Sequence, residues 1–311
     1  MKKTISGAVF SAIFVLFAGL FFARPECARE HAPVQAESAI AIQDGALPAE
    51  TTALLQRAAD YSVRLRHAAF RFICQETVSE DVRGRGPGDR SSKRARNSWL
   101  YEYQVVVRAG QVSEDRVLLR KNKTKMRVEN AALETRFRSQ YSVFLPATFF
   151  AAEKQHAFFY RLEKHKKMNG RQVARLSIIP RPGFEEPGAG TAWVDEETGA
   201  VLKIQLSQHA IQGIESAEKR ARQAGARLLV SDVHYYEVER DGIWLPSRTS
   251  ITEHYVLNAV PVQEMDRSTW ELSSKVVSKS GGYRQFDVSR TWVKYSDFRF
   301  FVVDVQVREG R

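Results

Sequence analysis

The side chains that most often perform chemistry are scattered along this sequence. Its seven histidines include no paired spacing such as His-x-x-x-His, so no metal site is predicted. They are His31, His67, His156, His165, His209, His234 and His254. A bend between His156 and His165 would bring these two rings together, but we interpret both as surface or hydrogen-bonded histidines.

The acidic groups that general acid–base catalysis would need lie in segments with the composition of turns. Glu185 and Glu186 fall in a Pro- and Gly-rich stretch, and Asp195 opens the turn-like sequence Asp-Glu-Glu-Thr-Gly. A hydrolase that uses Glu185 and Asp195 is kept only as an alternative, and no catalytic residue is predicted. Cys74 lacks the signature of a nucleophile and is expected to pack beside the first helix. The glycines of Gly84–Gly88 run into charged residues and serine, so no phosphate loop and no cofactor are predicted.

Apolar and aromatic side chains on or beside predicted strands are the remaining candidates for a ligand site. A sheet curved around a helix encloses either a filled core or a cavity, and the sequence leaves both open. The candidate apolar ligand contacts are Phe149, Phe150, Phe158, Tyr160, Leu176, Ile178, Trp193, Tyr235 and Trp244.

The amino-terminal residues predict export. Lys2 and Lys3 precede an uncharged apolar run over Ile5–Phe22, which is the layout of a secretory signal. We predict a signal peptide at 1–28 and a flexible linker at 29–47. The run is at the short limit for a membrane span, so an uncleaved inner-membrane anchor is the alternative to cleavage. The protein is therefore expected to be periplasmic or envelope-associated.

The formal net charge of +11 is unevenly placed, with a basic stretch at residues 83–96. Glycine, serine and charged residues dominate it, so a disordered basic loop is predicted. Its cations are Arg83, Arg85, Arg90, Lys93, Arg94 and Arg96. Basic clusters bind polyanions by displacing counterions, but export removes nucleic acid as a partner. An anionic membrane surface, an acidic polymer or another envelope protein would remain, beside a solvated loop with no partner.

Hydrophobic periodicity predicts one helix followed by strands. From Pro48 apolar residues recur at helical spacing, and from Phe72 the period changes to two. The helical stripe consists of Leu54, Ala58, Tyr61, Leu65, Ala69 and Phe72. Asn169-Gly170 and Asp241-Gly242 predict tight hairpins, and Asp195–Gly199 predicts a third turn. The expected fold is a mainly β (α+β) single domain over 48–311, with a long antiparallel meander in a curved sheet or half-barrel.

Longer strands and short helices are expected in the remaining segments. Strands are predicted at Leu228–Glu239, Ile243–Tyr255, Phe286–Tyr295 and Phe298–Val307. A short exposed helix is predicted at Ile214–Ala226. One or two further helices are predicted within Leu133–Lys154, broken at Pro146.

Several short motifs resemble a known family. Gly-Thr-Ala-Trp-Val-Asp at 190–195 is followed by a turn and Val-Leu-Lys-Ile-Gln at 201–205, and then by Tyr235-Tyr236 and Asp-Gly-Ile-Trp-Leu-Pro at 241–246. Their order resembles the outer-membrane lipoprotein-sorting group of LolA/LolB-like half-barrels. The resemblance implies an amino-terminal helix and a long sheet around an apolar cavity, in proteins that carry or sense acylated lipoproteins. It carries no functional residue across to this chain.

The sequence thus favours a non-catalytic exported envelope protein that binds a hydrophobic group, such as an acyl chain or the lipid of a lipoprotein. The alternative is an envelope sensor or scaffold that binds another protein or an acidic polymer through its sheet and basic loop. The oligomeric state is left open.

Overall fold

The computed structural model describes residues 47–83, 94–108, 111–137, 142–184, 189–257 and 284–301. All of these belong to one compact unit, Gly45–Arg311. The predicted signal peptide and nearly all of the predicted linker lie outside the described residues.

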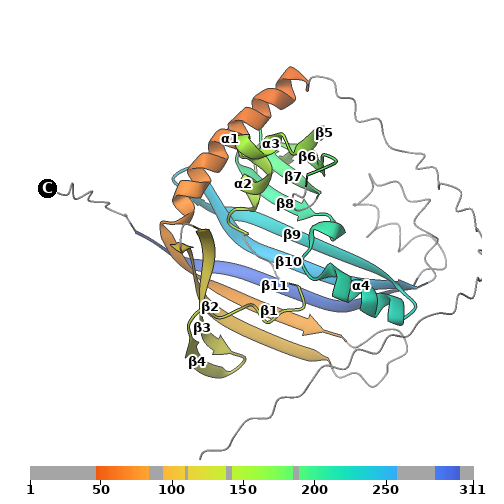
Figure 1. The fold of residues 1–311 in the computed structure, drawn as a ribbon. Helices are drawn as coiled ribbons and strands as arrows, with labels where there is room; N and C mark the ends of the chain where they lie inside the picture. Colours follow the sequence, from red (N-terminus) through yellow and green to blue (C-terminus); the bar gives the residue numbers. More distant parts are fainter. Residues whose placement is uncertain are drawn as a thin grey trace, which may run out of the picture. The chain divides into compact units, whose positions relative to one another are not determined.

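The eleven described strands form one antiparallel sheet in the order β4-β3-β2-β1-β11-β10-β9-β8-β7-β6-β5. The first four are β1 Phe72–Val82, β2 Ala95–Arg108, β3 Gln111–Lys121 and β4 Thr124–Val128. The other seven are β5 Phe158–Met168, β6 Arg171–Pro180, β7 Gly190–Asp195, β8 Val201–Leu206, β9 Arg227–Arg240, β10 Ile243–Leu257 and β11 Arg284–Phe300. Two meanders, β1–β4 and β5–β11, are joined where β1 pairs with β11 (Figure 1). The predicted mainly β meander is confirmed.

The helices cover one face of this sheet, which we call the inner face. They are α1 Ala49–Ala69, α2 Leu145–Phe150, α3 Ala152–Gln155 and α4 Ile214–Gln223, with a short 3-10 turn at Gln208–Ala210. Leu228, Val230 and Tyr236 alternate onto the same face of β9; the first two pack with α4 and Tyr236 packs with α1. The connection from β4 to β5 joins opposite edges of the sheet and carries α2 and α3 beside α1.

Local sequence accounts for these elements. Pro48 caps α1, and its missing N–H removes no helical hydrogen bond at that position. The period-two alternation that starts at Phe72 ends the helical pattern. Asn169 and Gly170 have φ values of 52° and 80°, and Asp241 and Gly242 have 51° and 75°. Both pairs are therefore left-handed, as a tight hairpin requires, and both predicted hairpins are confirmed.

Two predicted boundaries are wrong, each for a local reason. The two strands predicted at Phe286–Tyr295 and Phe298–Val307 are one strand, β11, within the described residues. Asp297, with φ of 51°, lies at the register shift against β1, so a bulge bends the strand where a turn was predicted. Pro146 does not break a helix; it lies in the first turn of α2, where a proline removes no helical hydrogen bond.

Candidate functional site

One apolar layer of the inner face lies beneath α1, across β5–β8. Six of the predicted apolar candidates meet here: Phe149, Phe150, Phe158, Tyr160, Leu176 and Ile178. Leu54, Leu55 and Ala58 of α1 cover them. The six are at most 7% exposed, and Phe150 stacks on Tyr160 with ring centroids 5.9 Å apart. Three sources, namely α1, α2 and the sheet, contribute the apolar side chains that pack in this layer.

Of the three other predicted candidates, Trp193 and Tyr235 are placed elsewhere, and Trp244 packs against the layer while only half-buried. Trp193 and Tyr235 alternate with inner-face residues and so lie on the opposite, outer face. Lys203 lies between them, with its Nζ 4.1 Å from the Trp193 ring centroid and 5.5 Å from that of Tyr235. Trp244 is half-buried, with the Arg171 guanidinium 5.0 Å from its ring centroid. All three rings lie near cations, and Trp244 also packs against the edge of the apolar layer.

The inner face of β1, β10 and β11, which we call the polar half, carries buried carboxylates among apolar residues such as Val78, Ile251 and Val293. Glu76 and Glu253 are each 0% exposed, and Glu80 is 5% exposed. Arg116 of β3 donates to Glu76 with its Nε at 2.6 Å, and Arg136 donates to Glu253 with its Nε at 2.8 Å. Glu76 and Glu253 therefore each have an arginine partner, as a buried charge requires.

Hydroxyl groups and backbone complete this polar region. Ser289 donates its hydroxyl to Glu253 at 2.7 Å, and Thr291 donates to Glu80 at 3.3 Å. Glu80 also accepts the backbone N–H of Arg136 at 2.8 Å. Because Arg136 belongs to the connection between β4 and β5, these bonds hold that connection against the sheet.

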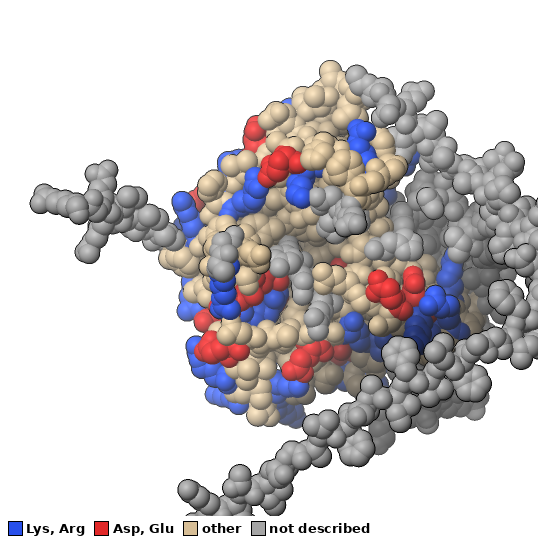
Figure 2. Space-filling view, in the orientation of Figure 1, with Lys and Arg blue, Asp and Glu red and all other residues tan. Residues whose placement is uncertain are grey.

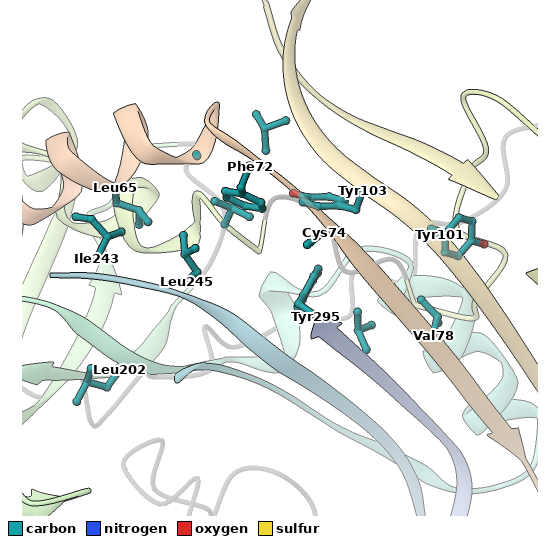
Figure 3. Close-up of a cluster of buried hydrophobic side chains, with 14 of the residues drawn as sticks. Leu65, Phe72, Cys74, Val78, Tyr101, Tyr103, Leu202, Ile243, Leu245 and Tyr295 are labelled. Atoms are coloured by element: carbon teal, nitrogen blue, oxygen red, sulfur yellow. The ribbon is translucent and has the colours of Figure 1, made fainter. Parts of the chain in front are cut away.

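Cys74 lies in the core beside two tyrosines. Figure 3 shows Tyr103 and Tyr295 on either side of it, and their rings are 5.7 Å apart. Cys74 is 1% exposed, and burial, followed by the nearby Glu76 charge, raises the pKa of its thiol well above the ordinary value. The thiol therefore stays protonated at neutral pH and is not a nucleophile. The predicted packing role is confirmed.

Asp232, His234 and Thr249 form a cluster that the sequence interpretation missed. The Thr249 hydroxyl is 3.1 Å from Nδ1 of His234, and Nε2 of His234 is 3.1 Å from Oδ1 of Asp232. The order resembles a nucleophile relay. However, the three residues are 1–3% exposed, and the Asp232–His234 contact lacks hydrogen-bond alignment. A substrate has no access to this buried cluster. Only the register of β9 against β10 brings Thr249 to His234.

The acidic candidate Asp195 stabilises a turn. It is 1% exposed and accepts hydrogen bonds from the backbone N–H and hydroxyl of Thr198, both at 2.8 Å. Burial alone would raise the pKa of Asp195, but these bonds and the nearby Arg171 hold it below its ordinary value. The other candidate carboxylates, Glu185 and Glu186, lie outside the described residues.

The two histidines considered as a pair do not meet. His165 contacts Glu196 at 2.8 Å, whereas the His156 ring packs edge-on against Phe184. Within the described part of the chain, no group of three His, Cys, Asp or Glu side chains is arranged to hold a metal ion. Nor is any helix of that part long and apolar enough to cross a membrane.

The predicted basic loop is described only at its two ends. Arg85, Arg90 and Lys93 lie outside the described residues. Arg83 pairs with Asp287 at 3.3 Å, and Nε of Arg94 donates to Asp81 at 2.6 Å. Arg96 lies in β2, opposite Asp81, so the loop was predicted too long at its carboxyl end. The hydrogen bond from Arg94 is the main reason that the pKa of Asp81 is lowered.

Comparisons with known proteins return only distant likenesses. No family model and no curated protein matches the chain. A DUF1329 family protein from Desulfovibrio piger is 12% identical, with 81% of this chain and 95% of that chain covered at a TM-score of 0.34. A LolA superfamily protein from Nitrosomonas europaea is 9% identical, with 80% and 94% covered at 0.34. A putative outer membrane lipoprotein-sorting protein domain from Vibrio parahaemolyticus is 12% identical, with 81% and 95% covered at 0.33.

The last two structures carry names of the group that the sequence motifs resemble. TM-scores this low support no argument about function.

Proposed function

We propose that this chain is an exported envelope protein that binds a hydrophobic group, such as an acyl chain, between α1 and the inner face of β5–β8, without catalysis. The observation that carries the proposal is the cover of this apolar layer. Apolar side chains of α1 and α2 close it, and Tyr61 anchors α1 to the sheet through two hydrogen bonds with the backbone of Trp244. Export rests on the uncharged run after Lys3, and mass spectrometry of the mature amino terminus in the native host tests that part.

The contacts of α1 favour replacement by a ligand. Leu54, Leu55 and Ala58 contribute burial that is non-directional, so an acyl chain can take their place without leaving polar groups unpaired. The Arg66–Glu153 ion pair at 2.6 Å is largely exposed, and exposed pairs stabilise little.

The polar half of the inner face does not offer the same opportunity. A ligand that displaced Arg116 or Arg136 would leave Glu76 or Glu253 buried without its arginine, which is strongly unfavourable. The proposal therefore places the ligand against the β5–β8 half, at the six apolar candidates.

Gly199, in the turn between β7 and β8, offers a way to test this position. Its φ is 71°, and a Cβ there would overlap the backbone of Arg57 and Ala58 in α1. An alanine at 199 would therefore push α1 away from the sheet. Gly225, with φ of 65° and open space around it, provides a control with similar backbone strain and no contact.

The experiment measures uptake of a fluorescent fatty acid by delipidated protein. We expect saturable binding by the unmodified chain and about tenfold faster uptake by Gly199→Ala, because a destabilised cover opens more often. Gly225→Ala should bind as the unmodified chain does. The proposal fails if delipidated protein takes up no probe, or if both glycine variants behave alike while circular dichroism shows both folded.

A further inference from the structure

The hairpin of β3 and β4 carries a dense cluster of positive charge. Between positions 120 and 127 the cations are Arg120, Lys121, Lys123, Lys125 and Arg127, with no acidic residue among them. Lys121 pairs with Glu134 and Arg127 pairs with Glu129. Arg120, Lys123 and Lys125 have no ion-pair partner among the described residues. Figure 2 shows basic side chains gathered, with acidic ones beside them, at the lower left, where Figure 1 places β3 and β4.

β4 is also a free sheet edge. Of the described strands only β3 pairs with it, so the backbone N–H and C=O groups of its other side have no strand partner. Every residue of β4 is exposed. Asn122, with φ of 53°, forms a tight turn that holds β4 beside β3.

The two faces of β4 differ in chemistry. Met126 and Val128 lie on one face and are 37% and 46% exposed, whereas Lys125 and Arg127 lie on the other. Val128 pairs with the buried Leu118, which identifies its face as the inner one. Lys125 pairs with Arg120, so two unpaired cations lie side by side on the outer face.

We propose that the β4 edge binds an extended acidic peptide segment of another protein by adding it to the sheet as a further strand. The free backbone groups pair with the peptide main chain. The outer-face cations attract acidic side chains on one face of the peptide, and Met126 and Val128 contact apolar side chains on its other face. The preferred sequence alternates acidic and apolar residues.

Charge decides between this occupant and the two others that a free edge could accept. A second copy of the chain would place Lys125 and Arg127 beside the same cations, which opposes pairing. An anionic membrane would attract the cations, but it offers no backbone groups for the edge, and the cations and the apolar residues point in opposite directions. A peptide strand provides acidic side chains for the outer-face cations, apolar side chains for Met126 and Val128, and backbone groups for the free edge.

The probe is a labelled peptide of about seven residues in which glutamate and valine alternate, a typical strand length. Fluorescence anisotropy measures its affinity for the full chain. We expect saturable binding that Arg120→Glu/Lys125→Glu weakens about tenfold, since attraction at two outer-face positions becomes repulsion. Lys219→Glu/Arg222→Glu, the same charge change on exposed residues of α4, should leave the affinity unchanged.

Two further measurements separate strand addition from simple charge attraction. Backbone N-methylation at alternate peptide residues should abolish binding, and hydrogen exchange of the β4 amides should slow when the unmodified peptide is bound. The proposal is overturned if the N-methylated peptide binds equally well, if the two charge variants behave alike, or if only phosphatidylglycerol vesicles bind and the β4 amides stay unprotected.

Discussion

The two halves of the inner face are held together by different physics. Under α1, across β5–β8, the contacts are apolar and non-directional. Across β1, β10 and β11, apolar residues such as Val78 and Val293 also pack, but the buried carboxylates among them bond to arginine and hydroxyl groups in fixed geometry. Apolar contacts can be exchanged for other apolar contacts, whereas a buried ion pair loses most of its stabilisation once one partner moves. The first half is therefore suited to admit a ligand, and the second to hold the sheet in one arrangement.

The largest expected effect comes from removing one partner of a buried pair. Arg116→Met leaves Glu76 and Glu114 buried without their main cation, and we expect about 3–5 kcal/mol of lost stability in urea denaturation. Adding Glu76→Gln to this variant should restore part of the loss, because one uncompensated charge disappears. If Arg116→Met alone is as stable as the unmodified chain, the polar half does not hold the sheet in one arrangement.

A cavity in the apolar half should have a smaller effect that a ligand can reverse. Leu176→Ala should lower the free energy of unfolding by about 2–4 kcal/mol, since Leu176 is fully buried under α1. A saturating fatty acid should recover more of the melting temperature in this variant than in Arg116→Met. Equal recovery in the two variants would remove the distinction between the halves.

The smallest effect concerns the amino-terminal end of α1. A hydrogen bond with Glu196, aided by the charges of Glu196 and Glu50, raises the pKa of His165. Because the folded pKa is the higher one, this stabilisation is fully present below about pH 6.5 and is lost as pH rises through the folded value. The protection factors of amides near Glu50, which correct for the intrinsic acceleration of exchange with pH, should then fall at higher pH. This pH-dependent loss of protection should vanish in His165→Gln and persist in His67→Gln.

Patterns within one element were readable from the sequence, and features that depend on register were not. Alternation predicted that Phe158 and Tyr160 share a face, and the Asn-Gly and Asp-Gly pairs predicted their hairpins. No local pattern shows that Thr249 meets His234, or that Arg136 crosses the sheet to Glu253, because each contact joins separate segments. Trp193 was grouped with the apolar candidates by residue type, although its alternation with Ala192 and Val194 indicated the other face.

The pairing of β1 with β11 also determines the order in which the sheet can be completed. These strands are the first and last of the described sheet, yet they lie side by side near its middle. Both meanders can form from local hairpins, but the seam between them closes only after residues 284–300 have been synthesised. Such distant pairing slows folding. Until then β1 presents an open strand edge, which makes the partly made chain prone to aggregation.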